Sequence, residues 1–322
     1  MDAVIEELGR IGIVPVIKID DVEKAVPLAK ALVAGEIPCA EVTFRTAQGE
    51  EAMRRISKEV PDILLGAGTV LTTDQVDRAI SAGAKFIVSP GLNPRVVSHC
   101  IGKGIPVTPG CSNPSDLEQA LEFGLEVVKF FPAEQAGGLD YIKAISAPYP
   151  NLKFMPTGGI NAGNIAKYIS FEKIHACGGS WMVNADLINS GNFEKITALS
   201  REAVQSLLGF TVPHIGLNAG SGEAALNAAK LFSSLFGFPA NDGNTSVFAG
   251  EKIEIMKLPS APGKYGHIAL ETNSLKRARV YLERKGITFD PNSVKKDAGG
   301  NINVIYCNEE ILGFALHLVQ KK

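Results

Sequence analysis

The chain has 322 residues, of which 45% are hydrophobic and 20% are charged, and its formal net charge is -2. This balance is typical of a folded globular protein, and the length exceeds that of one ordinary domain, so we expect two domains. Nucleic acids bind to surfaces with an excess of Lys and Arg, so a nearly neutral chain argues against a nucleic-acid partner.

The N-terminal segment carries Asp2, Glu6 and Glu7 where a secretory signal would be basic. No apolar run reaches the roughly 18 residues that a membrane span needs. We therefore expect a cytoplasmic protein with no membrane partner. The five cysteines are scattered without C-x-x-C spacing, which is typical of reduced thiols.

Short β-rich runs alternate with helical patterns between residues 12 and 182, which is typical of repeated βα units. Eight such units are the number that closes a parallel barrel. The sequence thus predicts an α/β fold, a (β/α)8 TIM barrel over residues 1–210, whose last helix runs from Phe193 to Leu208 after Asn192. The predicted strands are Ile13 to Ile19, Ala40 to Thr46, Leu64 to Val70, Phe86 to Gly91, Ile105 to Cys111, Glu126 to Pro132, Lys153 to Gly159 and Ile174 to Trp181.

Capping residues mark several helix starts within this region. They are Thr73 with Asp74, Asn93-Pro94, Asn113-Pro114 and Asn161. The predicted loops after the strands are short, and barrel active sites lie at the carboxyl ends of the strands.

The alternating βα pattern ends before Gly209, and Thr211-Val212-Pro213 resembles a linker. An internal repeat follows, because residues 213–217 resemble residues 266–270 and each segment precedes a helix in the same apolar register. Each half then ends in a strand entered through a glycine. We expect a small α+β domain of two βαβββ repeats over residues 213–322.

Lys129 lies among apolar residues near the end of the sixth predicted strand. Burial disfavours an ammonium ion, so this lysine is expected to have a lowered pKa and to supply the neutral amine that attacks a carbonyl. A lysine extending from the barrel rim into water is the alternative, and Lys18 is the rival nucleophile.

The second predicted strand places Glu41, Thr43 and Arg45 on one face, because side chains alternate along a strand. If that face points into the barrel, Glu41 can transfer protons and Arg45 can bind a carboxylate. A structural Glu/Arg pair is the alternative.

Glycines end the third, seventh and eighth predicted strands. Glycines after the last two strands of a barrel are a common phosphate site, because backbone N–H groups can approach the anion. Tight turns are the alternative. Gly66 and Gly68 of the third strand would let a ligand approach the backbone, whereas the phosphate prediction concerns Gly158, Gly159, Gly178 and Gly179.

Over residues 1–208 the sequence resembles the 2-keto-3-deoxy-6-phosphogluconate / 4-hydroxy-2-oxoglutarate aldolase family. In order, the segments that carry the resemblance are Glu41-Val42-Thr43-Phe44-Arg45-Thr46, Gly66-Ala67-Gly68-Thr69-Val70, Ser89-Pro90-Gly91, Val128-Lys129-Phe130-Phe131-Pro132-Ala133-Glu134, Pro156-Thr157-Gly158-Gly159-Ile160 and Gly178-Gly179-Ser180-Trp181.

This resemblance implies a class I aldolase that releases pyruvate from a small 2-keto acid, needs no cofactor and forms a homotrimer. Lys129 would be the Schiff-base lysine and Glu41 the acid/base group. A phosphate-binding barrel that forms no lysine adduct is the alternative. The implied substrate-binding residues are Arg45, Thr69, Pro90, Phe131, Thr157, Gly158, Gly159, Gly178, Gly179 and Ser180.

Residues 213–322 resemble the vicinal oxygen chelate superfamily, which includes glyoxalase-like enzymes. In that fold the first and last strands of each repeat supply metal ligands, which implies His214, Glu254, His267 and His317 here. Such a set suits a divalent Zn, Ni, Mn or Fe ion. The domain would then be a metal-dependent lyase, isomerase or dioxygenase. The alternative is a module without metal that senses a metabolite or mediates assembly.

Overall fold

The computed structural model describes residues 1–258 and 262–321, and the chain divides into two compact units, Met1–Leu207 and Leu208–Lys322. We call them the first and second unit. No helix within the described ranges is long and apolar enough to cross a membrane.

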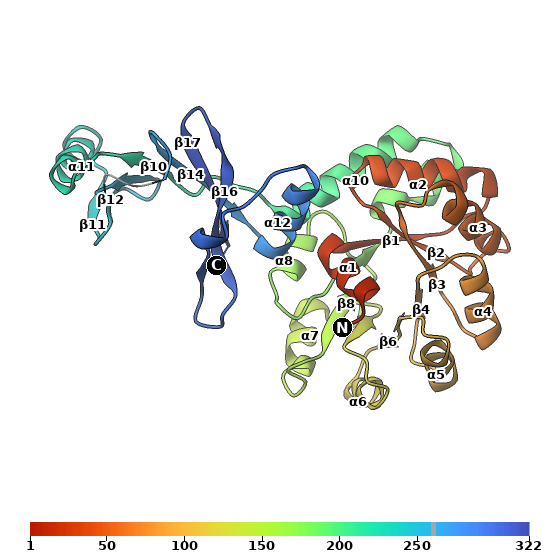
Figure 1. Ribbon diagram of the computed structural model, residues 1–322. Helices are drawn as coiled ribbons and strands as arrows, with labels where there is room; N and C mark the ends of the chain where they lie inside the picture. The colour runs from red at the N-terminus through yellow and green to blue at the C-terminus, as the bar shows by residue number, and fades with distance from the viewer. Residues whose placement is uncertain (259–261, 322) are drawn as a thin grey trace. The chain divides into compact units, whose positions relative to one another are not determined.

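Parallel strands form the centre of the first unit, with helices α2 to α7 around their outside (Figure 1). The strands are β1 (Ile13–Ile17), β2 (Cys39–Thr43), β3 (Leu64–Gly68), β4 (Phe86–Val88), β5 (Val107–Thr108), β6 (Gly110–Cys111), β7 (Val127–Phe130), β8 (Lys153–Pro156) and β9 (Cys177–Gly179). The helices are α1 (Ala3–Ile11), η1 (Val22–Lys24), α2 (Ala25–Ala34), α3 (Gly49–Glu59), α4 (Thr73–Ser81), α5 (Pro94–Gly102), α6 (Pro114–Glu122), α7 (Gly138–Ser146), α8 (Ile165–Ile169), η2 (Trp181–Val183), α9 (Ala185–Asn189) and α10 (Phe193–Leu208).

Strand pairing leads from one strand to the next around the first unit. One sheet has the order β5-β4-β3-β2-β1-β9, and a second has the order β6-β7-β8. Two isolated parallel bridges, Phe154 to Ile174 and Thr157 to Gly178, connect the β8 segment to the β9 segment. The mixed α/β fold with parallel strands is therefore confirmed.

The predicted strand Ile105 to Cys111 is divided into β5 and β6, which meet on either side of Pro109. Proline has no N–H to donate to a ladder, so the pairing stops there. The carbonyl oxygen of Pro109 still accepts a hydrogen bond from the Lys129 N–H at 3.0 Å. Strand pairing thus continues from β4 to β5 and from β6 to β7, with a break at Pro109.

Helix capping agrees with the predicted starts at three helices. The Asn93, Asn113 and Asn192 side chains accept hydrogen bonds from the first turns of α5, α6 and α10. The prediction at Thr73 is wrong by one residue, because Thr72 caps α4. Asn161 is not a cap either, since α8 begins only at Ile165 and the Asn161 side chain binds the loop before it.

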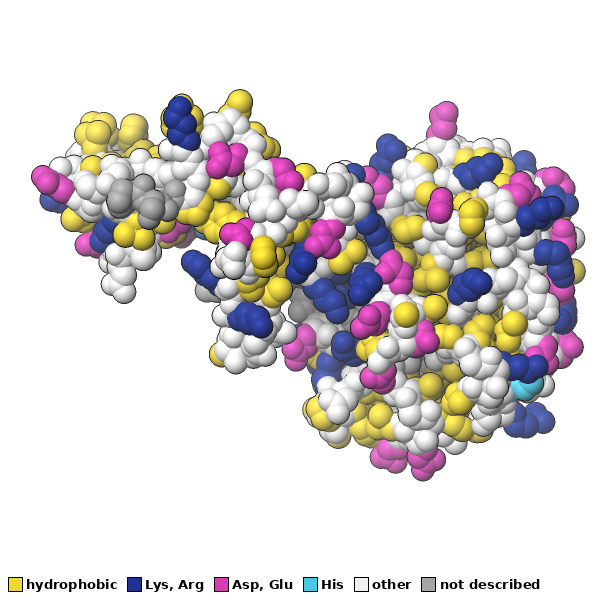
Figure 2. Space-filling model, in the orientation of Figure 1, with side chains coloured by type: hydrophobic (Ala, Val, Ile, Leu, Met, Phe, Trp, Pro, Cys, Tyr) yellow, Lys and Arg dark blue, Asp and Glu magenta, His cyan; other side chains and the backbone are white. Residues whose placement is uncertain are grey.

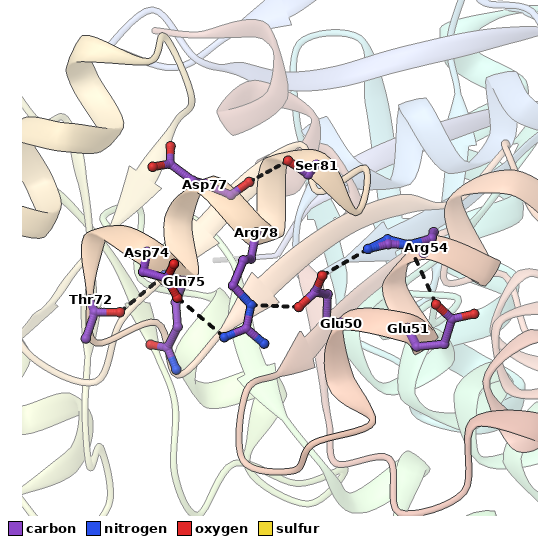
Figure 3. Close-up of polar contacts among 9 residues, drawn as sticks. All are labelled: Glu50, Glu51, Arg54, Thr72, Asp74, Gln75, Asp77, Arg78 and Ser81. Atoms are coloured by element: carbon purple, nitrogen blue, oxygen red, sulfur yellow. Dashed lines mark hydrogen bonds and ion pairs between the residues drawn. The ribbon is translucent and has the colours of Figure 1, made fainter.

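Ion pairs join α3 to α4 (Figure 3). Arg78 of α4 binds Glu50 of α3 at 2.7 Å, and Arg54 binds the same carboxylate at 2.9 Å. The Arg78 guanidinium also lies 5.5 Å from the centre of the Phe44 ring, in the turn after β2. Exposed pairs of this kind add little stability, so they accompany the packing of α3 and α4 and do not determine it. Acidic and basic side chains are likewise mixed over the face of the first unit in Figure 2.

The second unit is built on one eight-stranded sheet with the order β11-β12-β13-β10-β14-β17-β16-β15. Ala225 and Ala229 of α11 pack on Val247, Ala249 and Ile255 to form a core on its first half. Its elements are β10 (Ile215–Asn218), α11 (Gly222–Phe236), β11 (Ala240–Asp242), β12 (Ser246–Ala249), β13 (Ile253–Met256), β14 (Gly266–Thr272), α12 (Leu275–Arg284), η3 (Pro291–Ser293), β15 (Lys295–Lys296), β16 (Ile302–Ile311) and β17 (Phe314–Gln320).

The two central strands of this sheet, β10 and β14, are antiparallel. Ile215 pairs with Ile268, and Gly216 pairs with His267. The sequence repeat matches Ile215 with Ile268, so each of these two residues lies opposite its own counterpart.

Phe154→Ala tests the packing of the first unit. Phe154 is fully buried in β8, so we expect the free energy of unfolding to fall by about 3–5 kcal/mol. Urea denaturation followed by the fluorescence of Trp181, the single tryptophan, reports this unit. Leu121→Ala, on an exposed side of α6, is the control and should change stability by less than about 0.5 kcal/mol. Equal losses in both variants would contradict the described core.

Candidate functional site

Glu41 and Lys129 meet inside the first unit. The Lys129 Nζ lies 3.8 Å from the Glu41 Oε1, and the two residues are 5% and 0% exposed. Their strands, β2 and β7, are not neighbours in either sheet. A contact between them requires both side chains to point into the space that the strands enclose. Lys129 is therefore buried, whereas Lys18 is largely exposed and bound to Asp20 at 2.8 Å.

Burial raises the pKa of Glu41, while the charges of Lys129 and Arg45 act in the opposite direction without cancelling the effect. Neither carboxylate oxygen has a hydrogen-bond partner among the residues that the structure describes. Gly68 of β3 leaves the room for this carboxyl group, because a Cβ atom there would overlap the Glu41 side chain. The site thus holds a buried carboxyl group with a raised pKa beside the Lys129 amine.

The predicted alternation along the second strand holds only in part. β2 ends at Thr43, whose hydroxyl donates to the Ile17 carbonyl oxygen at 2.8 Å. Arg45 lies in the following turn and is exposed. The rule of alternating faces does not apply in a turn, so the prediction that Arg45 continues the strand face is wrong. Its charge nevertheless acts on Glu41.

The other predicted substrate residues follow the carboxyl ends of their strands. Phe131 follows β7, is 39% exposed, and its ring centre lies 5.3 Å from the Lys129 Nζ. Thr69 follows β3 with a positive φ of 56°, and Pro90 follows β4; both are partly exposed. Thr157 follows β8 and is buried. All four belong to the same end of the parallel strands as Lys129.

Gly158 and Gly159 form the loop after Thr157 with φ values of 102° and 80°, which favour glycine. The side-chain amides of Asn161 and Asn164 donate to the Gly159 carbonyl oxygen at 3.2 and 3.0 Å. Within the described part of the chain, neither glycine donates its N–H to another backbone group. Free N–H groups in such a loop are suitable donors for an anion.

The second glycine pair follows a different pattern. Gly178 and Gly179 are buried at the end of β9 and are followed by exposed Ser180. A Cβ atom at Gly178 would overlap the Thr157 hydroxyl, and one at Gly179 would overlap the Trp181 ring. Gly178 therefore allows the end of β9 to approach Thr157, while Gly179 leaves room for the Trp181 ring.

In the second unit, the structure brings the four predicted metal ligands together. His214, His267 and His317 each place one ring nitrogen so that the three nitrogen atoms lie within 4.8 Å of one another. The Glu254 Oε2 lies 3.3 Å from the His214 Nε2 and 3.1 Å from the His267 Nε2. Their strands are adjacent in the order β13-β10-β14-β17, with His214 directly before β10.

The electrostatics of this cluster suit cation binding. Burial alone would raise the pKa of Glu254, but hydrogen bonds with His214, His267 and Ser246 hold it far below its usual range. Burial, together with the neighbouring His267 and His214, lowers the pKa of His317 to about 3, so its imidazole is neutral at pH 7. Among the described residues, the buried Nδ1 atoms of His267 and His317 have no hydrogen-bond partner.

Sequence reasoning missed the residues that surround the predicted ones. The Ser246 hydroxyl donates to the Glu254 Oε1 at 2.6 Å, and the Tyr306 ring lies 4.6 Å from the His317 ring between centres. In the first unit, the Tyr168 hydroxyl donates to Glu134. Glu134 belongs to a segment that carries the family resemblance, but its partner lies 34 residues away with no local signal.

Comparison with known proteins identifies relatives of the first unit. Over 205 residues the chain is 51% identical to the 2-dehydro-3-deoxy-phosphogluconate aldolase of Treponema pallidum, a match that covers 64% of this chain and 98% of that protein. Over 193 residues it is 44% identical to the KHG/KDPG aldolase of Escherichia coli K12, covering 60% and 91%.

Solved structures give the same result. The KDPG aldolase of Legionella pneumophila, with pyruvate captured as a covalent carbinolamine intermediate, is 39% identical with a TM-score of 0.60 and covers 62% of this chain and 97% of that chain. The Zymomonas mobilis ZM4 aldolase, with 3-phosphoglycerate, is 41% identical with a TM-score of 0.58, covering 62% and 94%. The family model for KDPG and KHG aldolase matches residues 4–199 and leaves the second unit outside. Because that match covers more than half of the 322 residues, the chain belongs to the KDPG and KHG aldolase family.

Proposed function

We propose that the first unit is a Schiff-base aldolase. It cleaves 2-keto-3-deoxy-6-phosphogluconate to pyruvate and glyceraldehyde 3-phosphate, or 4-hydroxy-2-oxoglutarate to pyruvate and glyoxylate. This proposal rests on one observation: the side chains of Lys129 and Glu41 are both buried, and the Lys129 Nζ lies 3.8 Å from the Glu41 carboxyl group. The names of the relatives support the same activity.

The reaction begins when the neutral Lys129 amine adds to the C2 carbonyl of the keto acid. Loss of water gives an iminium ion, which accepts the electron pair of the C3–C4 bond as that bond breaks. Glu41 takes the proton of the C4 hydroxyl, so the leaving fragment departs as an aldehyde. The remaining enamine is protonated at C3, and hydrolysis releases pyruvate and the free lysine. A Glu41 pKa above the usual range suits a group that must both accept and return a proton.

Two groups of residues around this pair fit the two ends of the substrate. Arg45, with Thr69 and Thr157, would bind the carboxylate, while Pro90 and Phe131 would pack against the keto acid. The glycine loops would hold the phosphate through backbone N–H groups. The phosphate residues are Gly158, Gly159, Gly178, Gly179 and Ser180.

The proposal extends to the architecture. We infer that the strand pairings of the first unit close a (β/α)8 barrel, that residues 1–210 and 213–322 are separate domains, and that the aldolase assembles as a homotrimer, as its family resemblance implies. The route through Lys129 uses no cofactor.

We also propose that the second unit is a metal-binding, vicinal-oxygen-chelate-like domain. The order of its elements supports this proposal, because a strand, a helix and three strands run from β10 to β13, and the same order with an added η3 turn runs from β14 to β17. His214 and His267 occupy counterpart positions in this repeat, as do Glu254 and His317. Three imidazoles and one carboxylate fit a divalent Zn, Ni, Mn or Fe ion, which would act as a Lewis acid toward an oxygen ligand.

Reduction with borohydride in the presence of pyruvate should attach a stable adduct to Lys129, because the reagent traps an iminium ion. Lys129→Ala should lower kcat for cleavage by roughly 10⁴-fold or more, since the covalent route is lost. Lys18→Ala is the control and should keep both the adduct and the activity. Peptide mass spectrometry locates the adduct, and a label on Lys18 instead would reassign the nucleophile.

Gly68→Ala should lower kcat/KM by about 10²-fold, because the added methyl group displaces the Glu41 carboxyl group from its position beside Lys129. Gly102→Ala is the matched control, since a Cβ atom at that position has no neighbour within 4 Å among the described residues. Steady-state kinetics on both variants, with melting temperatures to check folding, test this. Unchanged kcat/KM in Gly68→Ala would contradict the proposed role of Glu41.

After treatment with a chelator, the full chain should bind one divalent ion per chain in calorimetric titrations with Zn²⁺, Ni²⁺, Mn²⁺ and Fe²⁺ separately. Binding should raise the melting temperature, because only the folded state offers the complete ligand set. His317→Ala should weaken binding by at least about tenfold, whereas His99→Ala, in the first unit, should not. No stoichiometric binding of any of these ions would favour a metabolite-sensing or assembly module.

A further inference from the structure

A second carboxylate beside the glycine loops, that of Glu134, is held by a residue from a later helix. The Tyr168 hydroxyl donates a hydrogen bond to the Glu134 Oε1. Tyr168 belongs to α8 and is only 1% exposed, so the phenol is fixed by its packing. Glu134 itself follows β7 and is exposed. A buried donor thus determines where an exposed negative charge is placed.

The aliphatic part of Glu134 lies directly against the loop that we assign to phosphate. A Cβ atom built on Gly159 would lie 2.5 Å from the Glu134 Cγ. The Glu134 N–H donates to the Gly158 carbonyl oxygen at 3.1 Å. The Glu134 stem is therefore packed against the glycine loop, so the rotation of its carboxyl group decides how close the charge lies to that loop.

The hydrogen bond turns the carboxylate toward the start of α7. The Glu134 Oε1 and the Tyr168 hydroxyl oxygen each lie 3.2 Å from a Cβ atom built on Gly138, the first residue of that helix. The N-terminal end of a helix stabilises negative charge. The carboxylate consequently has a favourable position away from the glycine loop, which it keeps as long as Tyr168 donates.

We propose that Tyr168 is a positioning residue that determines specificity for phosphorylated substrates. It keeps the Glu134 carboxylate out of the Gly158–Gly159 loop, so that a substrate phosphate meets N–H donors there and no like charge. This inference rests on the proposed phosphate site. Without the tyrosine hydroxyl, the carboxylate rotates freely and repels the dianion.

Tyr168→Phe tests this because it removes the hydrogen bond and retains the buried ring. We expect KM for 2-keto-3-deoxy-6-phosphogluconate to rise about fivefold to tenfold, the effect of one like charge a few ångströms away near a protein surface. KM for 4-hydroxy-2-oxoglutarate, which has no phosphate, should stay within about twofold, and kcat for both substrates should change little. Competitive inhibition by inorganic phosphate should weaken in parallel.

Two further variants separate charge from structure. In a Glu134→Gln background the carboxylate charge is absent, so adding Tyr168→Phe should leave KM for the phosphorylated substrate unchanged. Tyr149→Phe is the matched control, because it removes a second tyrosine–glutamate hydrogen bond, from Tyr149 to Glu118 at 3.3 Å. It should alter neither KM. Melting temperatures show whether each variant is folded.

An equal rise in KM for both substrates, or a rise that persists in the Glu134→Gln background, would show a structural role and overturn the inference. If inorganic phosphate inhibits the wild type and Tyr168→Phe equally, the inference about Tyr168 fails while the phosphate site stands. If inorganic phosphate does not inhibit the wild type at all, the proposed phosphate site fails, and the inference fails with it.

Discussion

The contact between Glu41 and Lys129 imposes the strongest constraint on the first unit. Two ionisable groups removed from water are costly unless they are close together and well placed. Here they come from β2 and β7, which are not neighbours, so their 3.8 Å approach depends on how all the intervening strands pair. Gly68 completes the arrangement by leaving room for the carboxyl group. An error in any of these pairings would separate the two side chains.

In the second unit, too, polar side chains from different strands are brought together, here three histidines and one glutamate. His267 lies over β10 because Gly216 has no side chain at that position, and Glu254 then reaches His267 and His214 from the adjacent β13. Four polar side chains thus gather on the four central strands of one sheet. Because the four residues come from β13, β14, β17 and the position directly before β10, the cluster depends on strands that are far apart in the sequence.

Features that depend on a few neighbouring residues, such as helices and their caps, could be predicted from the sequence. The helix Phe193–Leu208 and the Asn93 cap follow from periodicity and from side chains that bind the first turn of a helix. Lys129 was singled out because a lysine among apolar neighbours is conspicuous, and the four residues of the second unit were implied by a resemblance; the structure places each set close together, and their functional roles stay predictions. The strand predictions were wrong at Pro109, which interrupts a strand, and at Arg45, which lies in the turn after β2 has ended.

The interactions that sequence reasoning could not supply are those between distant segments, and glycine connects several of them. Gly159 lies against the Glu134 stem, Gly178 against the Thr157 hydroxyl, and Gly216 against the His267 ring. In each case the informative feature is a missing Cβ atom, and the sequence does not reveal which distant residue occupies the space that it leaves. Each of these glycines therefore helps to determine where a side chain from a distant segment of the chain can lie. That is the physical reason why the motif glycines belong to the site even where they bind no substrate.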